Sequence, residues 1–421
     1  MVSVRTYQKL PWFLGSGLVR VADAIYRVPA RLTNKKNKKT VEIEMITNRE
    51  IFKNYVKNGG EFIASPQIGA GAGFDTRLAG KTWMSRTTIE DTVNACNRFD
   101  MIPLYNFGII DLTSLTDTIK WEHIGTEYSN NNTRVQNRSH FKTPKGDLET
   151  ITVEEELKGG VCIKPLITHE EELDILEYYL DAILEVKDFS TVTNHVKNCR
   201  EIIGEEALDI QWAMQPYEML CFPDTMNTVM LTYDRPEQFR RLMDKILRLD
   251  EYLLKAVALG GADFVFLGGP GSEMISPKFY EDYLVPYSKI VTDMAHQNEL
   301  LIYSHICSPI EPMLTLGYYN QMGIDLFETL SESPVGNIRS IRDAFSKLDE
   351  SICTRGNIGL DMLLNNTPDE IRSKSLDILQ AAKDMGRKHI LAASDYMFYD
   401  VTEENVHAMC KAVRDFNGLT D

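Results

Sequence analysis

His305 and Cys307 are the residues of this sequence whose types and spacing best suit metal chemistry. They end the stretch Leu300-Leu-Ile-Tyr-Ser-His-Ile-Cys307, whose apolar and β-branched residues predict a buried strand. Side chains alternate between the two faces of a strand, so an imidazole and a thiolate two residues apart point the same way. Both groups are common zinc ligands, and the pair therefore predicts part of a zinc site. A core histidine beside a buried free cysteine is the alternative that the spacing leaves open.

Two later segments that are also predicted to be strands end in acidic residues. Gly323-Ile-Asp-Leu-Phe-Glu328 closes on Glu328, and His389-Ile-Leu-Ala-Ala-Ser-Asp395 closes on Asp395. In a parallel barrel the C-terminal ends of the strands meet at one rim, where the active site forms. For either carboxylate, a structural role in capping a neighbouring loop is equally open. The predicted metal ligands are His305, Cys307, Glu328 and Asp395, and the candidate catalytic residues are Glu328, Asp395 and Tyr303.

Polar residues near the ends of other predicted strands are candidates for substrate contacts. Asn357 follows Gly356 at the end of one strand, Gln215 ends another, and Glu273 follows a glycine-rich turn. These three residues are predicted to line the same rim. Cys221 and Cys353 are expected to fill the core instead, as buried free cysteines commonly do.

Strand and helix patterns alternate from residue 61 to the end, and this rhythm predicts how the candidate residues are positioned. The eight strand candidates span residues 61–67, 101–107, 209–215, 264–269, 300–307, 323–328, 351–357 and 389–395. Eight parallel strands favour a closed barrel over an open sheet. The predicted fold class is therefore α/β, with a single (β/α)8 TIM barrel over residues 61–421.

Two segments depart from this rhythm. Residues from about 119 to 165 alternate polar and apolar side chains around the turn Thr143-Pro-Lys-Gly146, which predicts an antiparallel β-hairpin insertion. Residues 1–60 are predicted to form a basic helical extension, because the first forty carry nine Lys or Arg against one acidic residue. Such an arm is expected to pack on the barrel or on a second subunit, as in a homodimer.

Composition excludes several classes of function. The chain has 421 residues and a net charge of −16, which disfavours binding to nucleic acid. Its seven cysteines are scattered and form no C-x-x-C pair, so we expect reduced thiols and no disulfide framework. The sequence shows neither a signal peptide nor an apolar run long enough to span a membrane. A cytoplasmic location is the expectation that follows.

Several motifs resemble the uroporphyrinogen decarboxylase-like superfamily, most closely from about residue 205 to 417. Besides the His-Ile-Cys strand, they are Gly261-Ala-Asp-Phe-Val-Phe, Ile275-Ser-Pro-Lys-Phe-Tyr-Glu-Asp-Tyr-Leu-Val-Pro-Tyr287, Gly323-Ile-Asp-Leu-Phe-Glu, Gly356-Asn-Ile, Leu364-Asn-Asn-Thr-Pro-Asp-Glu-Ile371, Ile390-Leu-Ala-Ala-Ser-Asp and Thr402-Glu-Glu-Asn405. The resemblance implies a (β/α)8 barrel, in agreement with the strand count. It does not by itself fix the reaction.

The resemblance implies different site residues for different branches of the superfamily. Its decarboxylases carry an arginine-rich N-terminal substrate segment and no metal, and Pro11-Trp-Phe-Leu-Gly-Ser-Gly here has no such arginines. Its cobalamin-linked methyltransferases bind zinc through His-x-Cys, which His305 and Cys307 match, and a later cysteine. Asp395 stands where that cysteine is expected. Exchanging a thiolate for a carboxylate makes zinc a stronger Lewis acid, which suits polarising an ether or alcohol oxygen.

The leading hypothesis from the sequence is a zinc-dependent methyltransferase of a corrinoid system, of the O-demethylase type. It would move a methyl group from a small methylated substrate, such as a methoxylated aromatic, to the Co(I) corrinoid (cobalamin) of a partner protein. A methylcobamide:thiol methyltransferase is the first alternative. A metal-free decarboxylase of a tetrapyrrole-like acid and a non-catalytic corrinoid-binding module are the others.

Overall fold

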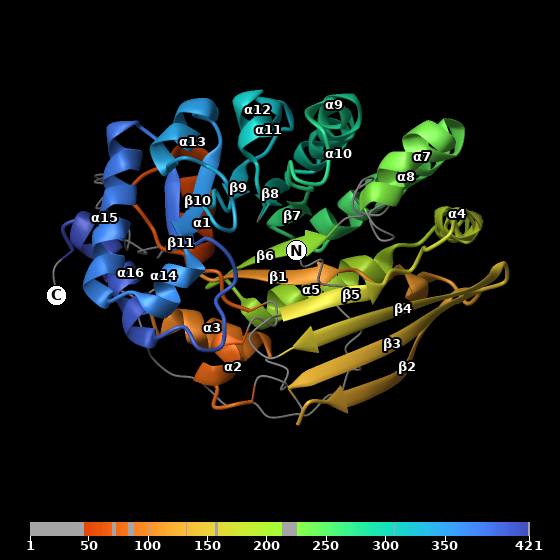
Figure 1. Cartoon of the computed structure of the whole chain (residues 1–421), viewed down its shortest axis with the longest axis horizontal. Helices are drawn as coiled ribbons and strands as arrows, with labels where there is room; N and C mark the ends of the chain where they lie inside the picture. Colours follow the sequence, from red (N-terminus) through yellow and green to blue (C-terminus); the bar gives the residue numbers. More distant parts are fainter. Residues whose placement is uncertain are drawn as a thin grey trace, which may run out of the picture.

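A curled parallel sheet with helices on its outer side is the centre of the molecule (Figure 1). The computed structural model describes residues 46–69, 73–82, 88–99, 101–131, 133–155, 159–212, 225–306 and 308–419. The sheet has seven strands in the order β1-β6-β7-β8-β9-β10-β11. Their bounds are β1 Leu104–Ile109, β6 Leu208–Trp212, β7 Phe264–Leu267, β8 Leu301–His305, β9 Leu326–Glu328, β10 Cys353–Ile358 and β11 His389–Ala393. The architecture is α/β and TIM-barrel-like.

Helices connect consecutive strands of this sheet and cover its outer face. Several begin at caps that the sequence signals: Thr367 forms a capping box with Glu370, and Ser276 caps the helix that starts at Pro277. The helices are α1 Asn48–Asn58, α2 Phe74–Leu78, α3 Ile89–Asn97, α4 Leu173–Leu184, α5 Ser190–Ile203, α7 Thr225–Asp234, α8 Pro236–Leu259, α9 Pro277–Phe279, α10 Val285–Gln297, α11 Glu311–Thr315, α12 Tyr318–Gln321, α13 Ile341–Lys347, α14 Leu360–Asn365, α15 Pro368–Asp384 and α16 Glu403–Phe416. Short 3-10 turns lie at η1 Leu112–Leu115 and η2 Glu170–Glu172, and a π-helical turn at η3 Tyr280–Leu284.

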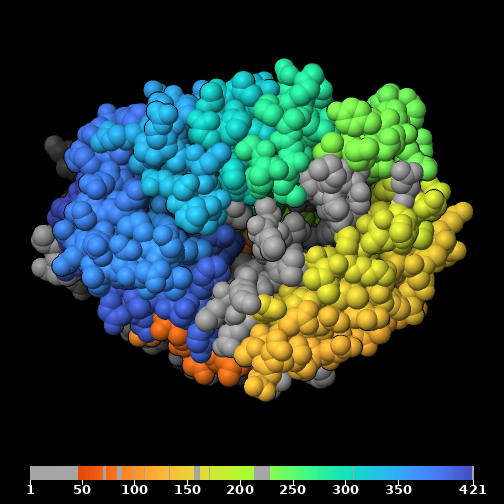
Figure 2. Space-filling view, viewed as in Figure 1, coloured from red at the N-terminus to blue at the C-terminus, as the bar shows by residue number. Residues whose placement is uncertain are grey.

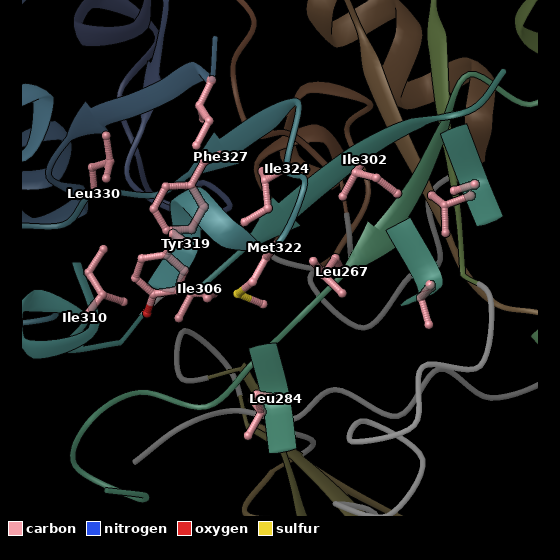
Figure 3. Packing of buried hydrophobic residues seen from close by; sticks show 14 of the residues in the cluster. Leu267, Leu284, Ile302, Ile306, Ile310, Tyr319, Met322, Ile324, Phe327 and Leu330 are labelled. Atoms are coloured by element: carbon pink, nitrogen blue, oxygen red, sulfur yellow. The ribbon is translucent and has the colours of Figure 1, made fainter. Parts of the chain in front are cut away.

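The strands are apolar on both faces because each face packs against a different core. Alternate residues such as Ile302 and Phe327 join the large core between the sheet and the helices. Figure 3 shows part of this layer, where Phe327 lies beside Tyr319 with ring centroids 4.8 Å apart. The intervening residues, among them Leu301 and Tyr303, form a second core inside the curl of the sheet. A side chain on a strand therefore reaches the interior only from every second position.

The segment from Ile63 to Ser65 lies between the two edges of the seven-stranded sheet. The amide of Leu391 on β11 donates to the carbonyl of Ile63 (3.0 Å), and the amide of Ser65 donates to the carbonyl of Leu391 (3.1 Å). On the other side, the amide of Ile102, just before β1, donates to the carbonyl of Ala64 (3.1 Å). The structure records this segment as an isolated parallel bridge rather than a strand. Pro66 follows at once and has no N–H to continue the ladder.

Helix α1 packs on the N-terminal end of the curled sheet. Its buried residues Phe52, Tyr55 and Val56 belong to the inner core. Its polar face is held by Arg49, whose Nε lies 2.8 Å from Oδ1 of the buried Asp263. The described part of the predicted N-terminal extension is thus tied to the barrel body, and residues 1–45 lie outside the described residues.

The insertion is a separate antiparallel sheet of four strands, more than the single hairpin predicted from the sequence. It runs in the order β2-β3-β4-β5, with bounds β2 Lys120–Ser129, β3 Arg134–Thr143, β4 Gly146–Glu155 and β5 Gly159–Lys164. The turn at Thr143 and Gly146 joins β3 to β4, where the Thr-Pro-Lys-Gly sequence favours a turn. Figure 2 shows the sheet, in gold and yellow, as one flank of the molecule. Among the described helices, none has the length and apolar character needed to cross a bilayer.

Candidate functional site

His305 and Glu328 meet at the C-terminal ends of β8 and β9. The two residues are directly paired in the parallel register of these strands. Nδ1 of His305 lies 2.7 Å from Oε1 of Glu328, which is fully buried, whereas the histidine side chain is 13% exposed. The site therefore combines a partly exposed imidazole with a fully buried carboxylate.

Three donors surround the Glu328 carboxylate. Tyr303 and His305 both hydrogen-bond Oε1, and the guanidinium of Arg355 on β10 pairs with Oε2. Burial alone would raise the pKa of Glu328, but the charge of Arg355 and the bonds from His305 and Tyr303 lower it below its ordinary value. The carboxylate is thus ionised and can only accept hydrogen bonds.

This contact fixes the tautomer of His305. Because the Glu328 carboxylate only accepts, Nδ1 of His305 must carry the hydrogen that it donates. A neutral imidazole then has its lone pair on Nε2. A carboxylate that holds the far nitrogen of a histidine in this way is the usual arrangement around histidine metal ligands.

Arg355 and Tyr303 support this arrangement from inside the sheet. Arg355 is 2% exposed, and its remaining N–H groups donate to the carbonyls of Ser65 (2.9 Å) and Pro66 (2.8 Å). Burial and the neighbouring Glu328 charge raise the pKa of Tyr303 well above its ordinary value, so the phenol stays a donor. The Ser65–Pro66 segment is therefore joined to β9 through one buried guanidinium.

Asp395 approaches the other nitrogen of His305. Its Oδ1 lies 3.7 Å from Nε2, beyond hydrogen-bond distance, and the Asp395 side chain is 30% exposed. Two ligands of a tetrahedral zinc ion with bonds of about 2.0–2.1 Å lie roughly 3.3 Å apart, so a small approach of Asp395 would let both bind one ion. These two groups are ligand types that zinc takes, and their 3.7 Å separation is slightly longer than the spacing of two ligands on one zinc ion.

The described residues do not form a complete metal site by themselves. Within the ranges given above, no group of three His, Cys, Asp or Glu side chains is arranged to hold a metal ion. Glu328 is engaged with Arg355, Tyr303 and His305, so its contacts suit orienting His305 better than binding a metal. Cys307, predicted as a ligand two residues after His305, lies outside the described residues.

The predicted substrate-contact residues that the structure describes lie in different places, and Asn357 lies near His305 and Glu328. Asn357 is 3% exposed near the site, and its Nδ2 donates to the carbonyl of Leu330 (2.9 Å) while Oδ1 is buried without a partner. Glu273 is exposed on the loop after β7, and the contacts among described residues do not join it to His305. Gln215 lies outside the described residues, as does Cys221. Cys353 is fully buried in the inner core, as expected.

Several residues of the site were missed in the sequence. Arg355 carried a signal, because a charged residue in the middle of a predicted inner strand must have a buried partner. Asn106 on β1 and Trp212 on β6 also reach the interior, and Nε1 of Trp212 donates to Oδ1 of Asn106 (2.7 Å). Tyr396 lies beside His305, with ring centroids 6.0 Å apart. These three carried no sequence signal, because their contacts exist only once the sheet curls.

Comparison with known proteins agrees with the fold and the motifs. Residues 152–416 match the uroporphyrinogen decarboxylase (URO-D) family. Uroporphyrinogen decarboxylase of Prochlorococcus marinus (strain NATL1A) is 22% identical over 276 residues, covering 63% of this chain and 73% of its own. The enzyme of that name from Trichodesmium erythraeum (strain IMS101) is 24% identical over 272 residues, covering 62% and 72%.

A solved structure, described as a methyltransferase from Methanosarcina mazei, has a similar fold. It is 14% identical with a TM-score of 0.59, over 88% of this chain and 99% of that one. At this identity the likeness concerns the fold alone. The sequence match, by contrast, covers more than half of the chain. The protein therefore belongs to the uroporphyrinogen decarboxylase (URO-D) family.

Proposed function

We propose that this protein is a zinc-dependent methyltransferase, which moves a methyl group from an O-methyl donor to the Co(I) corrinoid of a partner protein. The observation that carries the proposal is the pair of contacts made by His305: Nδ1 lies against Glu328, and Nε2 faces Asp395. A carboxylate that orients a histidine in this way is common around histidine metal ligands. The fold likeness to the Methanosarcina mazei methyltransferase supports the same reading.

His305 Nε2, Asp395 and Cys307 would hold the ion. When bound, zinc would supply Lewis acidity to the ether or alcohol oxygen. The Co(I) of the partner would supply the electron pair that takes the methyl group, and the C–O bond would break to release an alkoxide or phenoxide. Glu328 keeps the imidazole in its binding tautomer, and Tyr303 and Arg355 keep Glu328 ionised and fixed. One thiolate with an imidazole and a carboxylate leaves the site harder than a sulfur-rich one, which favours an oxygen substrate over a thiol.

We also infer that the chain completes a (β/α)8 barrel within one domain over residues 61–421. The support is the segment Ile63–Ser65, which hydrogen-bonds to β11 on one side and to Ile102 before β1 on the other. In such a barrel His305, Glu328 and Asp395 all lie at the C-terminal rim. That rim is the face on which a corrinoid protein would dock.

The charge inside the sheet weighs against a polyacidic substrate. Among the described strand residues that face the interior, Arg355 is the only cation, and Glu328 already pairs with it. A substrate with several carboxylates needs several basic partners. The curated relatives nevertheless keep decarboxylation of a tetrapyrrole-like acid as the competing function.

Zinc content tests the proposal first. We expect about one zinc per chain in the purified protein and loss of zinc in His305→Ala and Asp395→Asn. The matched control is His296→Ala, because His296 pairs with Asp325 (2.8 Å) in a similar histidine–carboxylate contact away from the site. Wild-type zinc content in His305→Ala would refute the site.

Methyl transfer tests it second. The zinc-loaded protein, mixed with a Co(I) corrinoid and methoxylated aromatics, methanol or thiols, should convert Co(I) to methyl-Co(III), seen in the visible spectrum. Transfer with O-methyl donors supports the proposal, and exchange with thiols alone would favour the thiol enzyme. Chelator-resistant release of CO2 from uroporphyrinogen would establish the decarboxylase instead.

A further inference from the structure

A continuous chain of contacts leads from His305 across the interior to β1 and β6. The ring of Tyr396 lies beside His305, and the Tyr396 hydroxyl accepts a hydrogen bond from Nδ2 of Asn106 (3.3 Å). Asn106 in turn accepts one from Nε1 of Trp212 (2.7 Å). All four side chains are partly exposed, so water or a ligand can reach them.

A second chain of contacts returns to His305 along the other side. The ring of Trp212 is parallel to that of Phe266, with an interplanar angle of 2° and centroids 4.0 Å apart. Phe266 lies next to Tyr303, with centroids 6.0 Å apart, and Tyr303 hydrogen-bonds Glu328. Together the two chains line the interior with flat side chains held in fixed orientations.

Two buried side-chain amides belong to segments that contact β11 or the residues just after it. The carbonyl of Gln67 accepts a hydrogen bond from the amide of Met397 (2.9 Å). Gln67 is 1% exposed, and both polar atoms of its side chain lack a hydrogen-bond partner. Asn357 lies on β10, paired with Ala392 of β11, and its Oδ1 is buried and also lacks a hydrogen-bond partner. Buried polar atoms without partners are unfavourable, and a ligand able to hydrogen-bond them would remove that cost.

The charge of these walls restricts the ligand further. Trp212, Phe266, Tyr396, Asn106 and Gln67 carry no charge at neutral pH. A ligand that contacts these side chains is therefore expected to be flat, largely apolar and able to form a few neutral hydrogen bonds.

We propose that these side chains form a subsite for the aromatic ring of the methyl donor, with Trp212 and Tyr396 as its flat walls and Gln67 as the partner of a ring hydroxyl. The substrate class is then an uncharged aryl methyl ether bearing a neighbouring hydroxyl, rather than methanol or a polyacid. This rests on the proposed function for the fate of the methyl group, but ring binding can be measured without turnover.

Calorimetric titration of the zinc-loaded protein with three probes tests the subsite. The probes are 2-methoxyphenol, methoxybenzene and methoxycyclohexane, which differ in the hydroxyl and in the flatness of the ring. We expect wild type to bind 2-methoxyphenol about tenfold more tightly than methoxycyclohexane. Trp212→Leu should remove most of the preference for a flat ring, whereas Gln67→Leu should remove only the preference for 2-methoxyphenol over methoxybenzene.

The control variant is Trp121→Phe, because Trp121 packs on Phe141 in the antiparallel insertion and should leave all three affinities unchanged. Thermal melting verifies that each variant folds, and Gln67→Leu retains the test if Trp212→Leu does not fold. Equal affinity of wild type for 2-methoxyphenol and methoxycyclohexane would overturn the subsite, and so would an unchanged ring preference in folded Trp212→Leu.

The two proposals fail separately. Methyl transfer from methanol by a protein without any aromatic preference would leave the proposed function standing and overturn the subsite. Selective binding of 2-methoxyphenol without methyl transfer to a corrinoid would support the subsite and count against the proposed function.

Discussion

Nδ1 of His305 and Oε1 of Glu328 lie 2.7 Å apart at paired positions on adjacent parallel strands. Strand pairing itself thus sets the distance, and no loop has to close to form the contact. Arg355 on the next strand fixes the same carboxylate from the opposite side. Three neighbouring strands therefore determine which nitrogen of His305 is available at the rim.

Removing the charge of Glu328 should affect stability and metal binding separately. In Glu328→Gln the buried Arg355 loses its counter-ion, and the free energy of unfolding should fall by about 3–5 kcal/mol. Zinc affinity should fall by about 10- to 100-fold because His305 is less firmly held. Urea unfolding and a competitive zinc chelator measure the two effects.

The double variant Glu328→Gln with Arg355→Met separates them further. It should recover much of the stability, since no unpaired charge remains buried, but not the zinc affinity. Glu311→Gln is the matched control, because Glu311 pairs with Lys347 near the surface and should change stability by less than about 1 kcal/mol. Unchanged zinc affinity in Glu328→Gln would contradict the positioning role.

Two cysteines, Cys307 and Cys353, should behave in opposite ways when they are replaced. Cys307→Ala should abolish zinc binding and turnover, because it removes a predicted ligand. Cys353→Ala should leave both nearly intact, since burial raises the pKa of this thiol to about 12 and makes it a core residue. Elemental analysis of both variants decides the matter, and full zinc in Cys307→Ala would refute the ligand assignment.

The free energy of unfolding should depend on pH because of the buried pair Asp209 and Asp263. Burial and the nearby Asp263 charge raise the pKa of Asp209 to about 7. Asp209 in the folded protein then keeps a proton that the same residue in the unfolded chain releases near pH 4. The contribution of Asp209 to stability is therefore present at low pH. That effect is lost as the pH rises through about 7.

Asp209→Asn should therefore flatten the decline between pH 5 and 8. The difference in the free energy of unfolding should exceed about 1.4 kcal/mol, the value of one pKa unit. Urea unfolding of wild type and variant at pH 5, 6, 7 and 8 provides the comparison. Parallel curves for the two proteins would show that Asp209 does not titrate in this window.

The contact of Arg49 with Asp263 should anchor helix α1. Arg49→Ala should lower the free energy of unfolding by about 1–2 kcal/mol, because a charge-assisted bond to a buried carboxylate is lost. Hydrogen exchange of the α1 amides should quicken in the variant. Arg240→Ala is the control: Arg240 pairs with Glu237 on the exposed face of α8, where such pairs contribute little. Equal effects of the two variants would contradict the anchoring.

Local signals in the sequence were sufficient for most elements of the fold. The Thr367 capping box and the Thr143 turn depend on residues three apart, and both appear where expected. A helix cap expected at Thr402 from its residue type is not formed: Thr402 stands at the start of α16, and its side chain makes no capping hydrogen bond. The segment before Pro66 was expected as a strand and forms only an isolated bridge, since a proline ends its ladder.

The candidate site was predictable only where a residue ends a strand. His305, Glu328 and Asp395 were found by that rule, and the structure brings all three together. Whether a carboxylate binds a metal or orients its neighbour depends on partners from other strands, such as Arg355. The contact of Trp212 with Asn106 joins residues 106 positions apart, which periodicity cannot relate.

The position of α1 determines from which side small molecules can reach His305. Helix α1 closes the end of the curled sheet opposite His305 with the side chains of Phe52, Tyr55 and Val56. The inner core fills the space between this end and His305. Among the described residues, this core separates His305 from the opposite end of the sheet, so His305 is reached from the rim. Under the proposed function, the methyl donor and its product would enter and leave on the side that a docked partner covers.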